Sequence, residues 1–233
     1  MKAQRLRIRY RVTAAGFGLS QRELVNAWEQ AAQAAGLPLA YSEGKRPGPQ
    51  ISLAAPLPQG VTSDWELADV YLAEWLPPDE AWRRLAGRLP AGVEAVEACE
   101  VGVGAPSLQS QLRWAEYEAE VPAEGLTAGE AQKAIAELLR ADTLPAEYRR
   151  EAKVRQYDLR PLVLDIHLEG ERDGCLVLSM RLRAEPEMTA RADQVLLALG
   201  LPAARRIHRR RLYLQEIPAA VLAYRRHAES QEE

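Results

Sequence analysis

The sequence predicts an α+β protein made of two ferredoxin-like units, each with four strands and two helices. Two observations lead to this prediction. Segments with the two-residue period of strands alternate with segments of helical period in the order strand, helix, strand, strand, helix, strand, and a similar pattern follows. One predicted helix in each half ends in a similar tetrapeptide, Ala35-Gly36-Leu37-Pro38 or Leu199-Gly200-Leu201-Pro202, as expected after an internal duplication.

The first unit is predicted over residues 1–106. In residues 5–12 arginines alternate with apolar residues, which is typical of a strand with one buried face. Ser20 and Glu23 are spaced as a capping box that opens a helix over residues 20–35, which Gly36 closes. The remaining predicted elements are strands near 50–55 and 65–74, a helix over 78–89 and a strand over 93–103.

The second unit is predicted over residues 107–226, after a loop at 104–111. Thr127 and Glu130 repeat the capping-box spacing in front of a helix, and Asp173-Gly174 is typical of a two-residue hairpin turn. Residues 227–233 are highly charged, so we expect a frayed tail. The other predicted elements are strands near 112–121, 151–157, 161–169 and 174–183, a helix over 187–199 and a strand over 205–214.

The composition is that of a soluble globular protein. Of its 233 residues 47% are hydrophobic and 27% are charged, and no stretch approaches 18 uninterrupted apolar residues. The chain opens with alternating arginines in place of a secretory signal. Cys99 and Cys175 lie far apart in the sequence and predict neither a disulfide framework nor a metal-binding pair. We therefore expect a cytoplasmic protein without a membrane partner.

The formal net charge of −3 conceals an uneven distribution. Residues 1–60 carry 8 Lys and Arg against 3 Asp and Glu, whereas residues 61–145 carry 6 against 16. Like charges on one strand face repel each other, so a row of arginines requires either the protein's own carboxylates or the phosphates of a nucleic acid. Arginine forks suit phosphate, and Tyr213 beside the second row could stack on a base, so RNA is the expected ligand. The predicted RNA-binding residues are Arg5, Arg7, Arg9, Arg11, Lys45, Arg46, Arg206, His208, Arg209, Arg210 and Arg211.

Several short motifs resemble a bacterial family of unknown function. They are Tyr41-Ser42-x-Gly44, Ile51-Ser52, Pro56-Leu57-Pro58-x-Gly60, Tyr157-Asp158-Leu159-Arg160-Pro161 and Ile207-His208-Arg209, in this order between about Arg5 and Gln215. Members of that family are encoded beside, or fused to, a radical S-adenosylmethionine (radical SAM) protein with a cobalamin-binding-type domain, so the resemblance implies a radical SAM partner. The family-signature residues are Ser20, Glu23, Tyr41, Ser42, Gly44, Pro47, Pro49, Ser52, Asp158 and Arg160.

The chain departs from this family at two histidines. Family members usually have Ser-His-Leu-Asp where this chain has Ser20-Gln21-Arg22-Glu23, and Gly-Phe-Asn-Pro-His-Pro where it has Gly44-Lys45-Arg46-Pro47-Gly48-Pro49. Imidazole is the side chain best suited to proton transfer near neutral pH, and neither Gln21 nor Gly48 can replace it. If the family acts through these groups, this member would retain binding alone.

Signatures of cofactor chemistry are absent from the sequence. It has no cysteine cluster for an iron–sulfur centre and no Walker loop, and its three histidines lack the spacing of a metal site. No cofactor and no metal are expected. We expect Asp158 and Arg160 to form an ion pair, and His167, on an apolar strand, to belong to the core.

The leading hypothesis is a noncatalytic adaptor that binds RNA and associates with a radical SAM enzyme. One alternative is an RNA-processing or RNA-modifying enzyme that uses His208 with Tyr41 or Ser42 as acid and base groups. A second alternative is a protein–protein interaction module that uses the acidic segments 94–100 and 116–120. The oligomeric state stays open.

Overall fold

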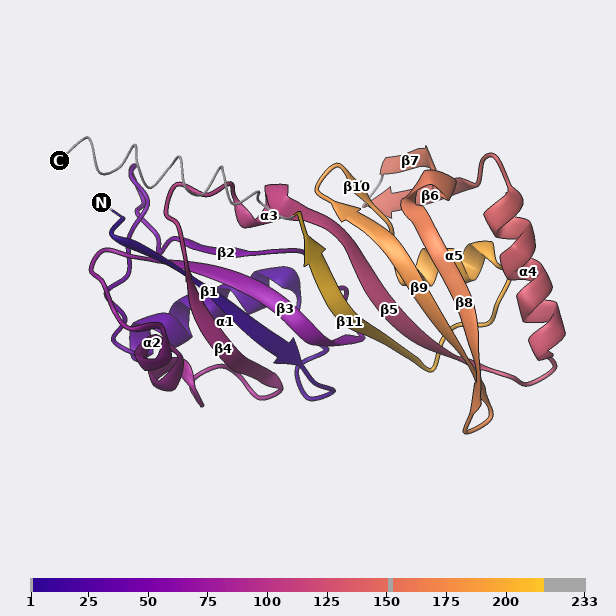
Figure 1. Ribbon diagram of the computed structural model, residues 1–233, viewed down its shortest axis with the longest axis horizontal. Helices are drawn as coiled ribbons and strands as arrows, with labels where there is room; N and C mark the ends of the chain where they lie inside the picture. Colours follow the sequence, from indigo (N-terminus) through magenta and orange to yellow (C-terminus); the bar gives the residue numbers. More distant parts are fainter. Residues whose placement is uncertain (1, 151–152, 216–233) are drawn as a thin grey trace. The chain divides into compact units, whose positions relative to one another are not determined.

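The computed structural model describes residues 2–150 and 153–215 (Figure 1). The protein is a mixed α+β protein with mostly antiparallel strands and few helices, which confirms the predicted class. The predicted tail, 227–233, lies outside the described residues. In the described part of the chain, no helix is long and apolar enough to span a membrane.

The chain divides by its contacts into two compact units. The first holds the residues up to Gln59, Asp64–Leu112, and Leu214 with Gln215 at the end of the described chain. The second holds Gly60–Ser63 and Arg113–Tyr213. The predicted bounds of the two ferredoxin-like units, residues 1–106 and 107–226, stay predictions.

Four strands of the first unit form a sheet in the order β4-β1-β3-β2. β4 pairs antiparallel with β1, β1 neighbours β3, and β3 pairs antiparallel with β2. Helix α1 packs against β2 and lies behind β1 in Figure 1, while α2 packs against β4. The elements are β1 (Gln4–Val12), α1 (Gln21–Ala34), β2 (Ile51–Leu53), β3 (Val61–Leu72), α2 (Pro78–Leu85), β4 (Val93–Val101) and the short α3 (Leu108–Gln111).

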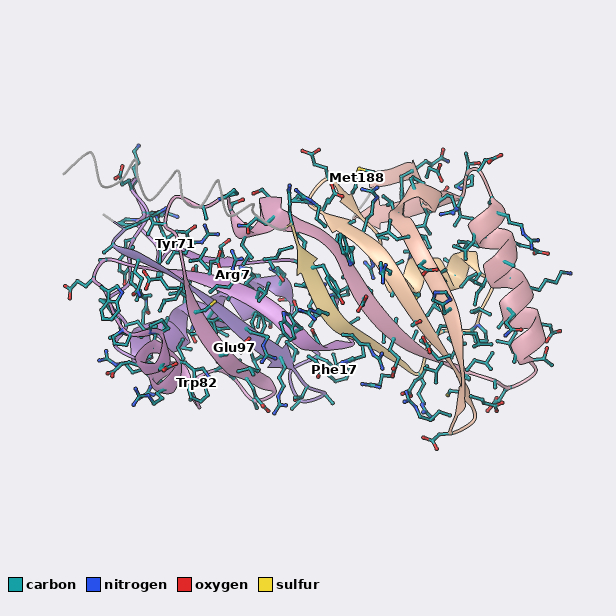
Figure 2. All side chains as sticks on the ribbon, in the orientation of Figure 1. Arg7, Phe17, Tyr71, Trp82, Glu97 and Met188 are labelled. Carbon is teal, nitrogen blue, oxygen red and sulfur yellow. The ribbon has the colours of Figure 1, made fainter. Side chains whose placement is uncertain are left out.

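The core of the first unit follows from the alternation along β1. Leu6, Ile8 and Tyr10 are buried, and the Tyr10 ring meets the edge of the buried Trp28 of α1 with 5.1 Å between centroids. Burying each such side chain contributes about 1.5–3 kcal/mol. On α2, the indole N–H of Trp82, which Figure 2 labels, donates to the Ala95 carbonyl of β4 at 3.1 Å and so fixes the helix on the sheet.

The second unit has the strand order β8-β9-β5-β11. β10 also pairs with β9, and β11 runs parallel to residues 61–63 of β3. β6 and β7 form a separate two-stranded ribbon, and α4 packs against β8. The elements are β5 (Leu112–Pro122), α4 (Ala128–Arg140), β6 (Pro145–Arg150), β7 (Lys153–Asp158), the 3₁₀ turn η1 (Arg160–Leu162), β8 (Val163–Arg172), β9 (Cys175–Glu185), β10 (Met188–Thr189), α5 (Ala192–Ala198) and β11 (Arg206–Leu214).

Local signals in the sequence fix several of these boundaries. Both capping boxes are confirmed: the hydroxyl of Ser20 or Thr127 accepts the N–H of the glutamate three residues on, whose carboxylate accepts the cap residue's own N–H. The predicted hairpin turn is confirmed by positive φ at Asp173 (49°) and Gly174 (70°). Strands β6 and β10 were not predicted. The helix expected over 187–199 begins only at Ala192, because residues 188–189 form β10.

Helices α1 and α5 end in the same type of cap. Gly36 and Gly200 adopt φ of 62° and 68°. The following N–H returns to the carbonyl five residues earlier, from Leu37 to Ala32 at 3.2 Å and from Leu201 to Leu196 at 3.1 Å. This is the Schellman pattern, in which a left-handed glycine stops the helix. The similar tetrapeptides therefore have similar structures.

Candidate nucleic-acid interface

The first two arginines of β1 share one buried carboxylate. Arg5 has no exposed surface, and its Nε donates to Asp69 Oδ2 at 2.8 Å. Its other donors reach the carbonyls of Ala105 at 2.9 Å and Pro106 at 3.0 Å. Arg7 Nε donates to Asp69 Oδ1 at 2.8 Å. Arg5 therefore holds β1, β3 and the loop after β4 together, and it cannot reach a phosphate in this structure.

The next two arginines of β1 pair with the glutamates directly opposite them on the neighbouring strand β4. Arg9 Nε donates to Glu97 at 2.7 Å, and Arg11 Nε donates to Glu94 at 2.7 Å. The register places these residues opposite one another. The hydrogen bond from Arg9 holds the pKa of the Glu97 carboxyl below its usual range. Arg9 also lies 4.3 Å from the centroid of the Trp65 ring. Figure 2 labels Arg7 and Glu97 on these strands.

Four arginines of the second unit surround two glutamates of β5. We call this group the arginine cluster: Arg172, Arg205, Arg206 and Arg210 with Glu118 and Glu120. Arg172 bridges both carboxylates at 2.7 and 3.0 Å, and Arg206 bridges both at 3.4 and 3.1 Å. Arg205 binds Glu120 and Arg210 binds Glu118, each at 2.7 Å. The cluster thus contains two more cations than anions.

The glutamate side chains of the cluster are buried, while its arginine side chains are about half exposed. The arginine side chains are 43–56% exposed and the two glutamate side chains only 9%. The guanidinium of Arg205, bonded to Glu120, lowers the pKa of that carboxyl. For Glu118, burial alone would raise the pKa, but the arginines outweigh it and the pKa is lowered. Both carboxyls are therefore ionised at neutral pH, and they balance only two of the four arginine charges.

The next aromatic and cationic residues of β5 and β11 form a stack. The rings of Trp114 and Tyr213 lie 5.3 Å apart and nearly parallel, and the exposed Arg211 lies 5.1 Å from the Tyr213 centroid. The Tyr213 hydroxyl donates to Glu116 at 2.8 Å. Burial and this acidic neighbour raise the pKa of Tyr213, so the phenol stays protonated.

Two residues predicted to bind RNA lie inside the second unit. His208 is 7% exposed, and its Nδ1 shares a 2.8 Å hydrogen bond with the Thr62 hydroxyl. Arg209 is 2% exposed, and its Nη1 donates to the Tyr117 hydroxyl at 3.3 Å. Both side chains therefore contribute to packing around β11.

The predicted cations Lys45 and Arg46 lie at the tip of a closed loop, residues 41–49. Both are exposed, as is Tyr41 at the start of the loop. Gly44 adopts a φ of 131°, a conformation that few other residues tolerate. The loop is closed by hydrogen bonds between Ser42 and Gly48.

The other family-signature residues support the backbone. Ser52 Oγ accepts from Gln109 at 2.6 Å. Asp158 and Arg160 do not form the expected ion pair with each other. Asp158 accepts hydrogen bonds from the backbone N–H groups of Leu144 and Arg160. The Arg160 guanidinium donates to the carbonyls of Leu139 and Val163. Ser20 and Glu23 form the helix cap described above.

The expectation that His167 belongs to the core is wrong. Its side chain is 65% exposed, and its Nε2 lies 2.8 Å from Asp165 Oδ2. Alternation explains the position, because the preceding Ile166 is buried and the next residue of a strand points to the opposite face.

Sequence reasoning missed part of the cationic surface. Arg172 stands alone among acidic neighbours in the sequence, and it reaches Glu118 only because β8 pairs with β9 and β9 pairs with β5. A visible signal was missed in residues 149–155, where four of seven residues are Arg or Lys. Of these residues, Arg149 and Arg150 belong to β6 and Lys153 and Arg155 to β7, and the register of this ribbon pairs Arg150 with Lys153. Among the described residues, no group of three or more His, Cys, Asp and Glu side chains could hold a metal ion.

One family model matches most of this chain. The model described as "Uncharacterized protein conserved in bacteria (DUF2344)" matches residues 5–192. The chain belongs to this family. The DUF2344 match runs from Arg5 in β1 to the start of α5, so the motifs from Tyr41 to Arg160 lie inside it. The comparison with curated proteins found no significant match.

Solved structures show distant likeness. A chain of the crystal structure of a Cbf5-Nop10-Gar1 complex matches 89% of this chain with 12% identity and a TM-score of 0.49. Chains of an H/ACA RNP bound to a substrate RNA containing 2′-deoxyuridine and of the archaeal box H/ACA sRNP Nop10-Cbf5 complex each match 86%, with 13% and 11% identity and TM-scores of 0.43. This chain spans about half the length of these chains, 46–50%. At such scores these likenesses do not bear on function.

Proposed function

We propose that this protein is a noncatalytic adaptor that binds RNA through the arginine cluster of its second unit. The observation that carries the proposal is the ratio of charges: four arginines with side chains about half exposed share two glutamates with buried side chains. The glutamates hold the arginines in place but neutralise only half of their charge. The remaining charge lies at the surface, where a polyanion can reach it.

The chemistry of the cluster favours phosphate. A guanidinium presents five N–H donors in a planar fork that matches two phosphate oxygens, and it stays charged at all physiological pH values. Arg205 and Arg210 each bond to one carboxylate in the cluster, so further donors remain. Phosphate contacts of this kind release counterions, which makes the affinity for RNA fall with salt concentration.

The proposal divides the predicted RNA-binding residues into two groups. Those with exposed charge are contact residues, and those that are mostly buried or paired one to one stabilise the fold. The proposed contact residues are Arg172, Arg205, Arg206, Arg210 and Arg211, with Lys45 and Arg46 on the loop of the first unit. The proposed structural residues are Arg5, Arg7, Arg9, Arg11, His208 and Arg209.

The finer fold assignment, two ferredoxin-like units, is part of the same proposal. In the order β4-β1-β3-β2 each helical crossover joins two strands that have one other strand between them, as in a split βαβ unit. The order β11-β5-β9-β8 repeats this arrangement with α4 and α5, and β6–β7 is an insertion before β8. These orders support the assignment to the ferredoxin-like class.

The proposed protein partner is a radical SAM enzyme, to which the adaptor would present RNA. The support is the motif resemblance that runs from Tyr41 to Arg209. Co-purification with the radical SAM protein encoded nearby, before and after ribonuclease treatment, tests this part separately. Recovery of the enzyme that survives ribonuclease indicates a direct protein contact, and no recovery under either condition removes the partner from the proposal.

An RNA titration tests the binding function. Fluorescence anisotropy with labelled RNA at two salt concentrations compares the unmodified protein with R172Q/R210Q, which removes two cluster cations, and with R11Q. Arg11 is the matched control because it is equally exposed, at 50%, but is paired one to one with Glu94. We expect tight binding that weakens with salt, a slope of log K against log salt reduced by about 1.4 in R172Q/R210Q, and little change in R11Q. Absent binding, salt-independent binding or equal losses in both variants would refute the proposal.

The structure gives neither alternative a comparable observation. For an RNA-modifying enzyme, the proposed acid–base residue His208 is only 7% exposed, and its Nδ1 shares a hydrogen bond with the Thr62 hydroxyl. For an interaction module, the acidic residues that would recognise a partner, among them Glu97 and Glu118, form ion pairs within their own units.

A further inference from the structure

We infer that loop 41–49 recognises unpaired RNA, with a base stacked on Tyr41 and the adjoining phosphates bound by Lys45 and Arg46. This inference rests on the proposed RNA-binding function and names the class of RNA that the protein selects. It concerns a different unit from the arginine cluster and other residues, so the two can fail separately.

Loop 41–49 is held in one conformation by its own hydrogen bonds. The Ser42 N–H donates to the Gly48 carbonyl at 2.9 Å, and the Gly48 N–H donates to Ser42 Oγ at 3.1 Å. Tyr41 and Pro49 form an antiparallel bridge just outside this pair. The prolines at 47 and 49 have fixed φ angles, which further restricts the loop. A ligand therefore meets a surface that needs little ordering.

The base of the loop is attached firmly to the sheet of the first unit. The Gln50 N–H donates to the Ala40 carbonyl at 2.8 Å, and the Tyr71 N–H of β3 donates to the Gln50 carbonyl at 3.0 Å. Leu39 forms a bridge with Leu72 at the end of the same strand. Tyr41 thus starts from a fixed backbone although its own side chain is 48% exposed.

Two cations lie at the tip of the loop. Lys45 and Arg46 are exposed, and within the described part of the chain neither forms an ion pair. This distinguishes them from the arginines of β1, each of which is bonded to a carboxylate of the same unit. Glu43 is the single acidic residue of loop 41–49, so the loop keeps a net positive charge.

An exposed aromatic ring in the same loop as two cations that have no ion-pair partner among the described residues fits single-stranded RNA better than a duplex. Unpaired bases can turn outward and stack on an aromatic side chain, whereas the bases of an A-form helix are stacked on each other. Stacking tolerates any base, because every base has a π face, and a positively charged surface can follow the backbone. Loop 41–49 combines both features within nine residues.

The test compares one unstructured RNA with one duplex. Anisotropy is measured with a labelled ten-nucleotide oligouridine and with a labelled RNA hairpin stem of equal phosphate count. The variants are Y41A, Y41F and K45Q/R46Q, and the control is F17A, because Phe17 is a 44% exposed aromatic residue of the same unit. Tryptophan fluorescence establishes that each variant is folded.

We expect Y41A to weaken oligouridine binding about tenfold or more and to leave hairpin binding unchanged, while Y41F and F17A bind like the unmodified protein. K45Q/R46Q should reduce the salt slope for oligouridine by about 1.4. If oligouridine binds and R172Q/R210Q weakens it but Y41A behaves like F17A, the inference about the loop is overturned and the proposed function stands. If the unmodified protein binds neither RNA, both fail. If Y41A does not fold, K45Q/R46Q and Y41F decide the outcome through the salt slope and the preference for oligouridine over the hairpin.

Discussion

Replacing Asp69 with asparagine should destabilise the first unit more than any single change to the exposed ion pairs. The Asp69 carboxylate accepts hydrogen bonds from Arg5 and Arg7, and neither the Asp69 nor the Arg5 side chain has any exposed surface. D69N removes the negative charge and leaves the Arg5 guanidinium buried without a counter-charge. Breaking a buried pair from one side in this way costs about 3–5 kcal/mol.

The matched comparison is E97Q, on the same sheet. The pair of Arg9 with Glu97 is partly exposed, at 21% and 58% for the two side chains, and such pairs are worth about 0–1 kcal/mol. Urea unfolding followed by tryptophan fluorescence separates the two variants. Four of the five tryptophans lie in the first unit, so the signal reports mainly on it. With a urea dependence of about 1–3 kcal/mol per molar, D69N should lower the midpoint by about 1 M or more.

A double variant tests the cause. Adding R5M to D69N removes the unpaired buried cation, and we expect the double variant to recover part of the lost stability, because a buried pair replaced by apolar groups is often tolerated. The reasoning is refuted if D69N unfolds at the same urea concentration as E97Q. It is also refuted if R5M makes D69N still less stable, since Arg5 would then stabilise the fold without its carboxylate.

Three further predictions concern the cluster, the helix caps and pH. E118Q removes one anion from the arginine cluster, so RNA should bind more tightly with a salt slope steeper by about 0.7, and weaker binding in the same anisotropy assay would contradict the proposed role of the cluster. G36A and G200A should each lower the free energy of unfolding in thermal denaturation by about 1–2 kcal/mol, because both positions have positive φ. An added Cβ meets no atom within 4 Å at either position or at Gly18, so the control G18A should have little effect. Arginines lower the pKa of the Glu97 and Glu120 carboxyls, so the stability that these carboxylates contribute is complete above the unfolded pKa of about 4.3 and is lost as pH falls through the lower folded pKa. The unfolding free energies of E97Q and E120Q should therefore depend less on pH below about pH 4. An unchanged pH dependence would contradict the assignment.

Features encoded by neighbouring residues could be predicted from the sequence. The capping boxes at Ser20 and Thr127 and the turn at Asp173-Gly174 depend on residues at most three apart, so short-range spacing is enough. The start of α5 was misplaced because residues 188–189 pair with β9. That pairing has no signal in the local spacing, and tertiary structure decided it.

The site was harder to predict, because charge pairing depends on register. The row of arginines in β1 was correctly expected to need anions, but Asp69 lies 64 residues from Arg5 and the sequence does not show which strand carries it. Arg172 lies 54 residues from Glu118 and was missed for the same reason. Arg209 belongs to a dense basic run and nevertheless packs on Tyr117 inside the unit. Density of charge in a sequence therefore does not indicate which charges remain at the surface.

The inner strand of the first unit carries the arginines of its ion pairs, whereas the inner strand of the second unit carries the glutamates. In the first unit the arginines lie on the inner strand β1 and most of their acidic partners on its neighbour β4. In the second unit the glutamates lie on the inner strand β5 and arginines on its neighbour β11. The four arginines of β1 bind three carboxylates, because Arg5 and Arg7 share the buried Asp69. The four arginines of the cluster bind two carboxylates, and their side chains remain about half exposed. A polyanion gains little by displacing a carboxylate that already neutralises its partner. The two units thus differ in the number of carboxylates available to their arginines. For this reason RNA binding should depend on Arg172 and Arg210 rather than on the arginines of β1.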